Sequence, residues 1–175
     1  INGEPVSESM LNPAVSEFSK RSLIVTYDVT DLLKKGNNEL SIWLGIGWYH
    51  KRAQGVVDGG PYVRAQLESV KPNGDHNVIT KSDEKWEAAN SGRYSIGNLW
   101  VNGEYIDKSE LITDLSSNAA DNLTWQQVVV GDIPQHKSSQ QMCELNTFYQ
   151  TFKPVAVHKI DDESYVYDMG HAFVG

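Results

Sequence analysis

Apolar and polar residues follow one another along this chain in short runs, and no segment shows a long amphipathic helical repeat. The runs richest in β-branched and aromatic residues are RSLIVTYDV (21–29), LSIWLGI (40–46), YVRAQLESV (62–70), HNVIT (76–80), VAVHKI (155–160) and SYVYDM (164–169). Side chains of these types pack well on a pleated surface, so each run predicts a β-strand.

The residues between these runs are typical of turns. KPNGD (71–75) carries an Asn-Gly pair between two predicted strands, which is a strong hairpin signal. Residues 30–36 begin with a capping hydroxyl at Thr30 and end at Gly36, which predicts one helical turn over 30–35, closed by a left-handed glycine. The pattern predicts an all-β fold, a jelly-roll-type antiparallel β-sandwich with a few short helical turns.

Two stretches lack a clear period. Residues 108–124 are polar and are expected to form an excursion loop. Residues 131–141 are also polar and contain Pro134, which leaves a linker and a sandwich-crossing strand with loose ends as alternatives.

Composition narrows the classes of partner. Lys and Arg number 15 against 23 Asp and Glu, a formal charge of −8, which argues against a nucleic-acid partner or an anionic membrane surface. No apolar stretch approaches the roughly 20 residues that span a bilayer, and the first ten residues do not resemble a signal peptide. Cys143 is the single cysteine, and the five histidines are not spaced as in a zinc site.

The segment LSIWLGIGWYHKR (40–52) is not a phosphate-binding loop, because the third glycine of a dinucleotide fingerprint is replaced by His50. Gly45 and Gly47 are instead expected to bend a strand and to place Trp48 and Tyr49 at its edge. An exposed aromatic ring suits the apolar face of a pyranose. The other tryptophans divide into a surface candidate, Trp100, and expected core residues, Trp43, Trp86 and Trp125.

The chain offers many carboxylates but no recognisable nucleophile. A glycosidase needs two facing carboxyl groups, one with a raised pKa, and sequence spacing in a β-sandwich cannot establish such a pair. A Gly-x-Ser-x-Gly elbow is also absent from the sequence.

An ordered series of motifs resembles the amino-terminal sandwich module of bacterial α-L-rhamnosidases. The matching segments are INGEPV (1–6), SKRSLIVTYDVTDLLKKGNNEL (19–40), LGIGWYHKR (44–52), AQLESVKPNGD (65–75), SDEKWEAA (82–89), LWVNGEYIDKS (99–109), KPVAVHKI (153–160) and YVYDMGHAFVG (165–175). The chain departs from the family pattern at Asn102 for Asp, at Ser109 for Arg and at His171-Ala172 for Gln-Asn.

The resemblance implies a domain boundary, and it implies that catalysis takes place in another domain of the parent enzyme. Residues 1–153 would be the sandwich module, and residues 154–175 would belong to a neighbouring β-sandwich. Catalysis in the family is inverting glycoside hydrolysis by a separate helical barrel, so no catalytic residue is expected here, and activity of the chain itself is the least favoured alternative. The implied partners are a rhamnose-containing glycan and the catalytic domain of the parent enzyme, which would be bacterial, and periplasmic or extracellular where it is exported.

The resemblance also implies a sugar site, since some modules of this type hold rhamnose through calcium. The candidate carbohydrate-binding residues are Trp48, Tyr49, Asp58, Trp100, Glu104 and Asp107. Asp58 is the candidate calcium ligand, although Gly59 follows it where the family has Asn. The alternative is a structural module that packs against the barrel and shapes its cleft.

Overall fold

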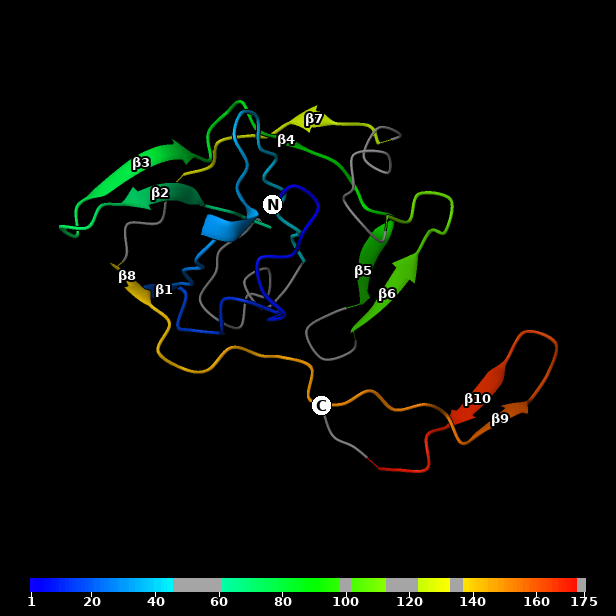
Figure 1. Cartoon of the computed structure of the whole chain (residues 1–175). Helices are drawn as coiled ribbons and strands as arrows, with labels where there is room; N and C mark the ends of the chain where they lie inside the picture. Colours follow the sequence, from blue (N-terminus) through cyan, green and yellow to red (C-terminus); the bar gives the residue numbers. More distant parts are fainter. Residues whose placement is uncertain (46–60, 98–101, 113–122, 133–136, 173–175) are drawn as a thin grey trace. The chain divides into compact units, whose positions relative to one another are not determined.

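The computed structural model describes residues 1–45, 61–97, 102–112, 123–132 and 137–172 (Figure 1). Apart from one short 3-10 turn, η1 (Thr30–Leu32), the regular elements in these ranges are all strands, which confirms the all-β prediction. The strands are β1 (Arg21–Ile24), β2 (Gln66–Val70), β3 (His76–Lys81), β4 (Glu87–Ala88), β5 (Arg93–Gly97), β6 (Asn102–Ile106), β7 (Gln126–Gln127), β8 (Lys137–Gln140), β9 (Ala156–Lys159) and β10 (Tyr165–Asp168). No described helix is long and apolar enough to cross a membrane.

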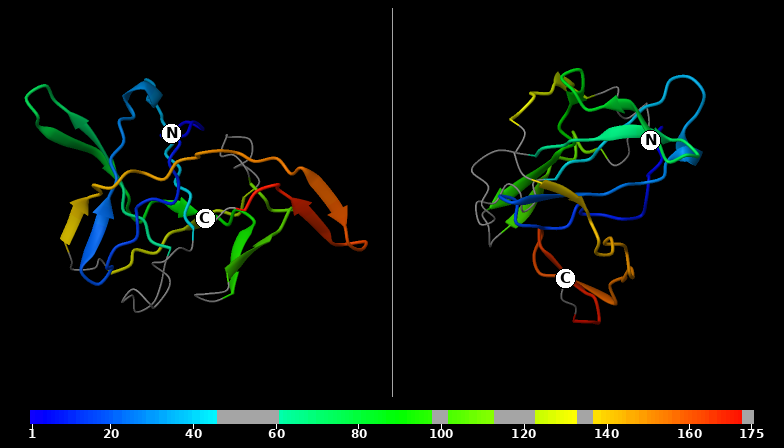
Figure 2. Two further views of the ribbon diagram at one scale, coloured as in Figure 1. Left: turned by 90° about the horizontal axis from the view of Figure 1, so that it is seen from below. Right: turned by 90° about the vertical axis from the view of Figure 1, so that its left-hand side faces the viewer.

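The described strands associate in five pairs, and the two ribbons of a pair such as β5 and β6 run side by side in every view (Figure 2). The pairs β2–β3, β4–β7, β5–β6 and β9–β10 are antiparallel, as predicted. The pair β1–β8, with Arg21 opposite Lys137, is the parallel exception among the described pairs. Two parallel strands need a long connection between them. Here the connection runs from the end of β1 at Ile24 to the start of β8 at Lys137. The closure into a jelly roll stays a prediction.

The chain divides into two compact units. The first contains Ile1–Ser7 and Pro13–Glu144, and the second contains Glu8–Asn12 and Leu145–Gly175. The second unit is held by the β9–β10 hairpin and by a bridge between Met10 and Asn146. The predicted domain boundary between residues 153 and 154 stays a prediction.

The hairpin predicted from the Asn-Gly pair is confirmed. In the turn, the Gly74 amide donates to the Lys71 carbonyl at 2.9 Å, and the Lys71 amide donates to the Asp75 carbonyl at 2.9 Å. Gly74 has φ +84°, a conformation that glycine adopts without steric cost. The strand predicted over 62–70 is shorter than expected, because only its second half pairs with β3.

The helical turn near Thr30 is present but ends at Leu32, so it is shorter than the predicted 30–35. Thr30 is itself held, since its amide and hydroxyl both donate to the Asp28 carboxylate, at 3.0 and 2.6 Å. The chain then continues as a loop through Gly36, at φ +96°. The Asn38 side chain closes this loop by bonding the Lys34 amide at 2.9 Å and the Lys34 carbonyl at 2.8 Å.

The strand predicted over 40–46 is wrong for its described part, because residues 40–45 form no strand. Trp43 in this segment is 48% exposed and Trp125 is 41% exposed, so the prediction that both are core residues is also wrong. Because residues 40–45 do not pair with another strand, they have no sheet face on which the Trp43 indole could be buried. Trp86 is half-buried.

The buried interior of the described residues is small. Ile112 is their one buried apolar side chain, and Gln141 is their buried polar side chain. Gln141 makes its hydrogen bonds within the first unit. Its side-chain oxygen accepts from the Ala14 backbone amide at 2.8 Å, and its backbone amide donates to the Ile24 carbonyl at 2.9 Å. This residue therefore joins the ends of β1 and β8 to the amino-terminal segment.

Candidate functional site

Two tyrosines define one face of the β5–β6 hairpin. Tyr94 on β5 is directly opposite Tyr105 on β6, and their ring centroids are 6.1 Å apart with the planes tilted by 36°. Opposed residues of an antiparallel pair share a face, and aromatic pairs at this spacing stabilise the sheet. Tyr94 is half-buried, whereas Tyr105 is 55% exposed, so the face presents an accessible phenol ring.

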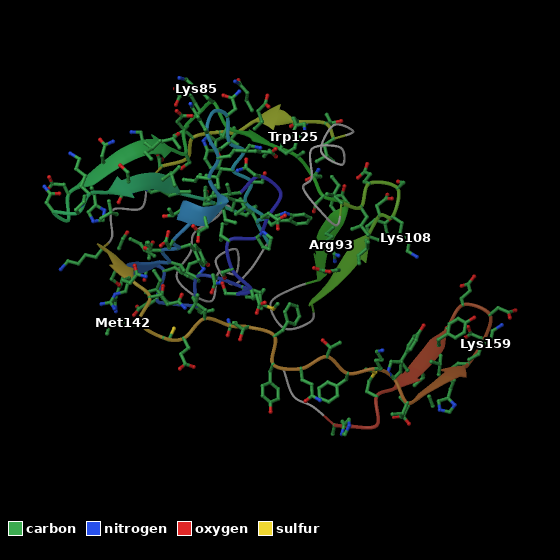
Figure 3. All side chains as sticks on the ribbon, viewed as in Figure 1. Lys85, Arg93, Lys108, Trp125, Met142 and Lys159 are labelled. Carbon is green, nitrogen blue, oxygen red and sulfur yellow. The ribbon has the colours of Figure 1, made fainter. Side chains whose placement is uncertain are left out.

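The opposite face of the hairpin carries an ion pair. Arg93, the residue before Tyr94, lies 3.4 Å from a carboxylate oxygen of the candidate Glu104. Because side chains alternate along a strand, this pair lies on the other side of the hairpin from the two tyrosines. Figure 3 shows Arg93 on β5. Both side chains of the pair are exposed to solvent, so its contribution to stability is small.

The candidate Asp107 lies directly after β6 and organises the turn there. Its Oδ1 atom accepts hydrogen bonds from the Ser109 hydroxyl at 2.6 Å and from the Ser109 amide at 2.9 Å. These two bonds, that from the hydroxyl first, hold the pKa of the Asp107 carboxyl below its usual value.

The structure adds two residues that the sequence did not single out. The Tyr94 hydroxyl donates to a carboxylate oxygen of Glu110 at 2.6 Å. This hydrogen bond raises the pKa of the Tyr94 phenol, and the negative charges of Glu110 and Asp107 add to the effect. Glu110 therefore contacts Tyr94 directly and the charge of Asp107 acts on the same phenol, whereas Glu104 is engaged with Arg93 on the opposite side of the hairpin.

The segment that carries Glu110 is folded tightly against the start of β5. The Asp107 amide donates to the Gly92 carbonyl at 2.9 Å, and the Ile112 amide donates to the Ser91 carbonyl at 3.1 Å. Gly92 has φ +74°, and a Cβ atom there would lie 2.6 Å from the backbone carbon of Glu110. Only glycine fits this close approach, which brings Glu110 to Tyr94.

The other predicted site residues, Trp48, Tyr49, Asp58 and Trp100, lie outside the described residues, so their part of the predicted site stays a prediction. Within the described ranges, no three His, Cys, Asp or Glu side chains gather in a group that could hold a metal ion. The pKa values of Asp28, Asp107 and Asp161 are all lowered by hydrogen bonds, the opposite of the shift that a general acid requires.

Sequence signals for Tyr94 and Glu110 were present but weak. GRYSIG and NGEYI each place a tyrosine within a short run next to a glycine, a pattern compatible with two paired strands. Glu110 stands in the polar stretch 108–124, whose pattern predicts a loop. Only the backbone contacts of residues 107–112 with Gly92 reveal that it meets Tyr94.

Comparison with known proteins gives one consistent family. The family model described as "Alpha-L-rhamnosidase N-terminal domain" matches residues 1–150. A protein of Formosa agariphila named α-L-rhamnosidase is 30% identical over the whole chain, and one of Streptomyces avermitilis is 28% identical over the whole chain. An α-L-rhamnosidase of an Alteromonas species is 24% identical, again over the whole chain. No solved structure matches this chain.

The extent of these matches is informative in itself. The chain spans 19%, 17% and 20% of the lengths of the three relatives, so it corresponds to one part of each. The ordered motifs of the sequence, the all-β elements and the family match over 1–150 agree. The chain belongs to the family of α-L-rhamnosidase N-terminal domains.

Proposed function

We propose that this chain is a non-catalytic accessory domain of an α-L-rhamnosidase, and that it binds rhamnose or a related glycan while the parent enzyme hydrolyses terminal α-L-rhamnosyl bonds. The observation that carries the proposal is the family match over residues 1–150 in a chain that spans a fifth or less of relatives named α-L-rhamnosidase. A rhamnose-containing glycan and the catalytic domain of the parent chain are the corresponding partners.

The state of the described carboxylates supports a non-catalytic role. A glycosidase needs one carboxyl group that stays protonated near neutral pH and a second that faces it across the substrate. Glu104 is paired with Arg93, and Asp107 is held in its ionised form by Ser109. The lowered pKa of Asp107 is the opposite of what a proton donor requires, and both carboxylates are compatible with accepting hydrogen bonds from sugar hydroxyls.

The test is a titration followed by heteronuclear NMR. We expect methyl α-L-rhamnoside to shift a defined set of resonances with a Kd on the order of 0.1–1 mM, typical of weak monosaccharide binding. The chain should release no nitrophenol from an aryl α-L-rhamnoside above background. Turnover that follows the purified chain and is lost in Glu104→Gln would contradict the non-catalytic assignment. An absence of shifts at tens of millimolar ligand, with and without calcium, would contradict sugar binding.

Calcium is part of the same proposal. Asp58 offers a carboxylate oxygen, but calcium takes six to eight oxygen ligands, and the described residues supply no acidic cluster to complete its shell. We therefore propose calcium only as an aid to sugar binding near Asp58. If it has this role, a chelator weakens rhamnoside binding and Asp58→Ala removes the dependence on calcium. Identical titrations with calcium and with chelator would contradict it.

A second function, packing against the remainder of the parent enzyme, is favoured by one observation. In the second unit, the large apolar side chains of Phe148, Tyr149 and Val155 are 75%, 97% and 68% exposed. Large apolar side chains exposed to this degree are typical of surfaces that another protein segment covers. If packing is the function, rhamnosides produce no shifts, and addition of the separately expressed remainder of a parent enzyme broadens or shifts these residues.

A further inference from the structure

From the geometry of the β5–β6 hairpin, we propose that its Tyr94–Tyr105 face, completed by Asp107 and Glu110, is a binding site for a neutral pyranose. We call these four residues the tyrosine face. The sugar would stack on Tyr105 and donate hydroxyl hydrogen bonds to the two carboxylates. The inference deepens the proposed carbohydrate binding, on which it rests, by assigning the ligand to a face in which Tyr94, Tyr105 and Glu110 join the predicted site residue Asp107.

The tyrosine face is organised before any ligand arrives. Tyr94 is fixed at both ends, because its ring packs against Tyr105 and its hydroxyl is bonded to Glu110. Glu110 is positioned by the backbone contacts of its segment with Gly92, and Asp107 by Ser109. The segment ends at Ile112, the buried apolar side chain of the described residues. A site whose groups are already ordered loses little conformational entropy on binding.

The chemistry of this face matches a sugar ring. Tyr105 offers a half-exposed aromatic surface, which suits the C–H face of a pyranose. Each carboxylate has more acceptor positions than the protein donors occupy, since an ionised carboxylate accepts about four hydrogen bonds. The Tyr94 oxygen also retains acceptor capacity after it donates to Glu110. Hydroxyl groups around a ring are the donors that such an arrangement binds.

A cationic ligand is the main competitor, because carboxylates and tyrosine rings also attract ammonium and guanidinium groups. Two features favour the neutral sugar. Both carboxylates already accept hydrogen bonds from uncharged hydroxyl groups of the protein, which are donors of the kind that a sugar supplies. Lys108, between Asp107 and Ser109, adds a positive charge in the same turn (Figure 3).

The experiment titrates the 175-residue chain with methyl α-L-rhamnoside while the aromatic resonances of Tyr94 and Tyr105 are followed. Both rings should shift along the same isotherm. Tyr105→Ala should weaken binding at least about tenfold, whereas Tyr105→Phe, which keeps the ring, should stay within about threefold. Tyr165→Ala is the matched control, because Tyr165 on β10 is 50% exposed, similar to Tyr105, and should leave the affinity unchanged. Circular dichroism checks that each variant is folded.

Each other outcome overturns the inference in a distinguishable way. If the rhamnoside binds, but Tyr105→Ala binds equally well and Trp48→Ala does not, the proposed function stands and this site is wrong. If the folded chain gives no shifts, both proposals fail. If the two rings respond to a lysine-rich peptide, with salt-sensitive affinity, and not to the sugar, the face binds a basic partner instead.

Discussion

The hydrogen bond between Tyr94 and Glu110 makes a testable prediction about proton binding. Because a phenol that donates to a carboxylate loses this bond on ionisation, the pKa of Tyr94 is raised above its usual value of 10.0. The bond therefore stabilises the fold fully at a pH below the usual tyrosine pKa of 10.0, and this stabilisation is lost as the pH rises through the raised pKa of Tyr94. In Glu110→Gln, we expect the pKa of Tyr94 to fall toward 10, measured by NMR of ¹³C-labelled tyrosine rings.

The matched control for this measurement is Glu104→Gln. Glu104 is a carboxylate of the same hairpin, but it is bonded to Arg93 on the opposite face. Its removal should change the titration of Tyr94 much less than Glu110→Gln does. An unchanged pKa of Tyr94 in Glu110→Gln would show that the hydrogen bond does not form in solution.

At the scale of elements, the loop after η1 makes the next prediction. The Asn38 side chain bonds the amide and carbonyl of Lys34 and the carbonyl of Gly36, the last at 3.1 Å, and accepts from Asn2 at 2.9 Å. This explains why a Lys-x-Gly-x-Asn motif follows the turn, since the asparagine replaces missing backbone partners. Asn38→Ala should lower the free energy of unfolding by about 1–2 kcal/mol, measured by urea denaturation.

Asn37→Ala tests whether this effect is specific. Asn37 is exposed and adjacent to Asn38, so this variant removes the same side-chain amide from a position that does not make the bonds of Asn38. We expect this change to stay within about 0.5 kcal/mol. Equal losses in the two variants would mean that the bonds of Asn38 do not hold the loop.

Local signals in the sequence predicted some elements and missed others for physical reasons. The β2–β3 hairpin was predictable, because Asn73 and Gly74 specify the turn and the partner strand is adjacent. The parallel β1–β8 pair was not predictable, because its paired residues, such as Arg21 and Lys137, lie far apart in the sequence. The polar run of β8 also lacks the alternation of a strand. The described residues 40–45 show the converse, since this apolar run forms no strand.

The same distinction holds for the candidate site. Glu104 and Asp107 were identified as possible ligands, but strand alternation separates Glu104 from the tyrosine face. Tyr94 and Glu110 meet only because residues 107–112 fold back on Gly92, a close contact that no local pattern specifies. Residue types were therefore easier to predict than the face on which they act.

At the scale of the whole molecule, burial differs between the two units. In the first unit, Gln141 and Ile112 are buried residues. The backbone amide of Gln141 donates to the Ile24 carbonyl, and that of Ile112 donates to the Ser91 carbonyl. In the second unit, none of the described residues is buried, and Val157, Val166 and Tyr167 on β9–β10 are all at least half exposed. A two-stranded hairpin with no buried side chains is marginally stable in water.

The last prediction follows from this contrast and concerns hydrogen exchange. Amides whose bonds break in local openings exchange faster than amides that require global unfolding. At low protein concentration, the paired amides of β9–β10 should therefore exchange at least about tenfold faster than those of Gln141 and Ile112, measured by hydrogen–deuterium exchange with NMR. If exchange of β9–β10 slows as the concentration rises, its exposed strand edges are pairing with a second copy. Equal protection of both units in a proven monomer would show that the β9–β10 hairpin is part of the first unit's cooperative fold.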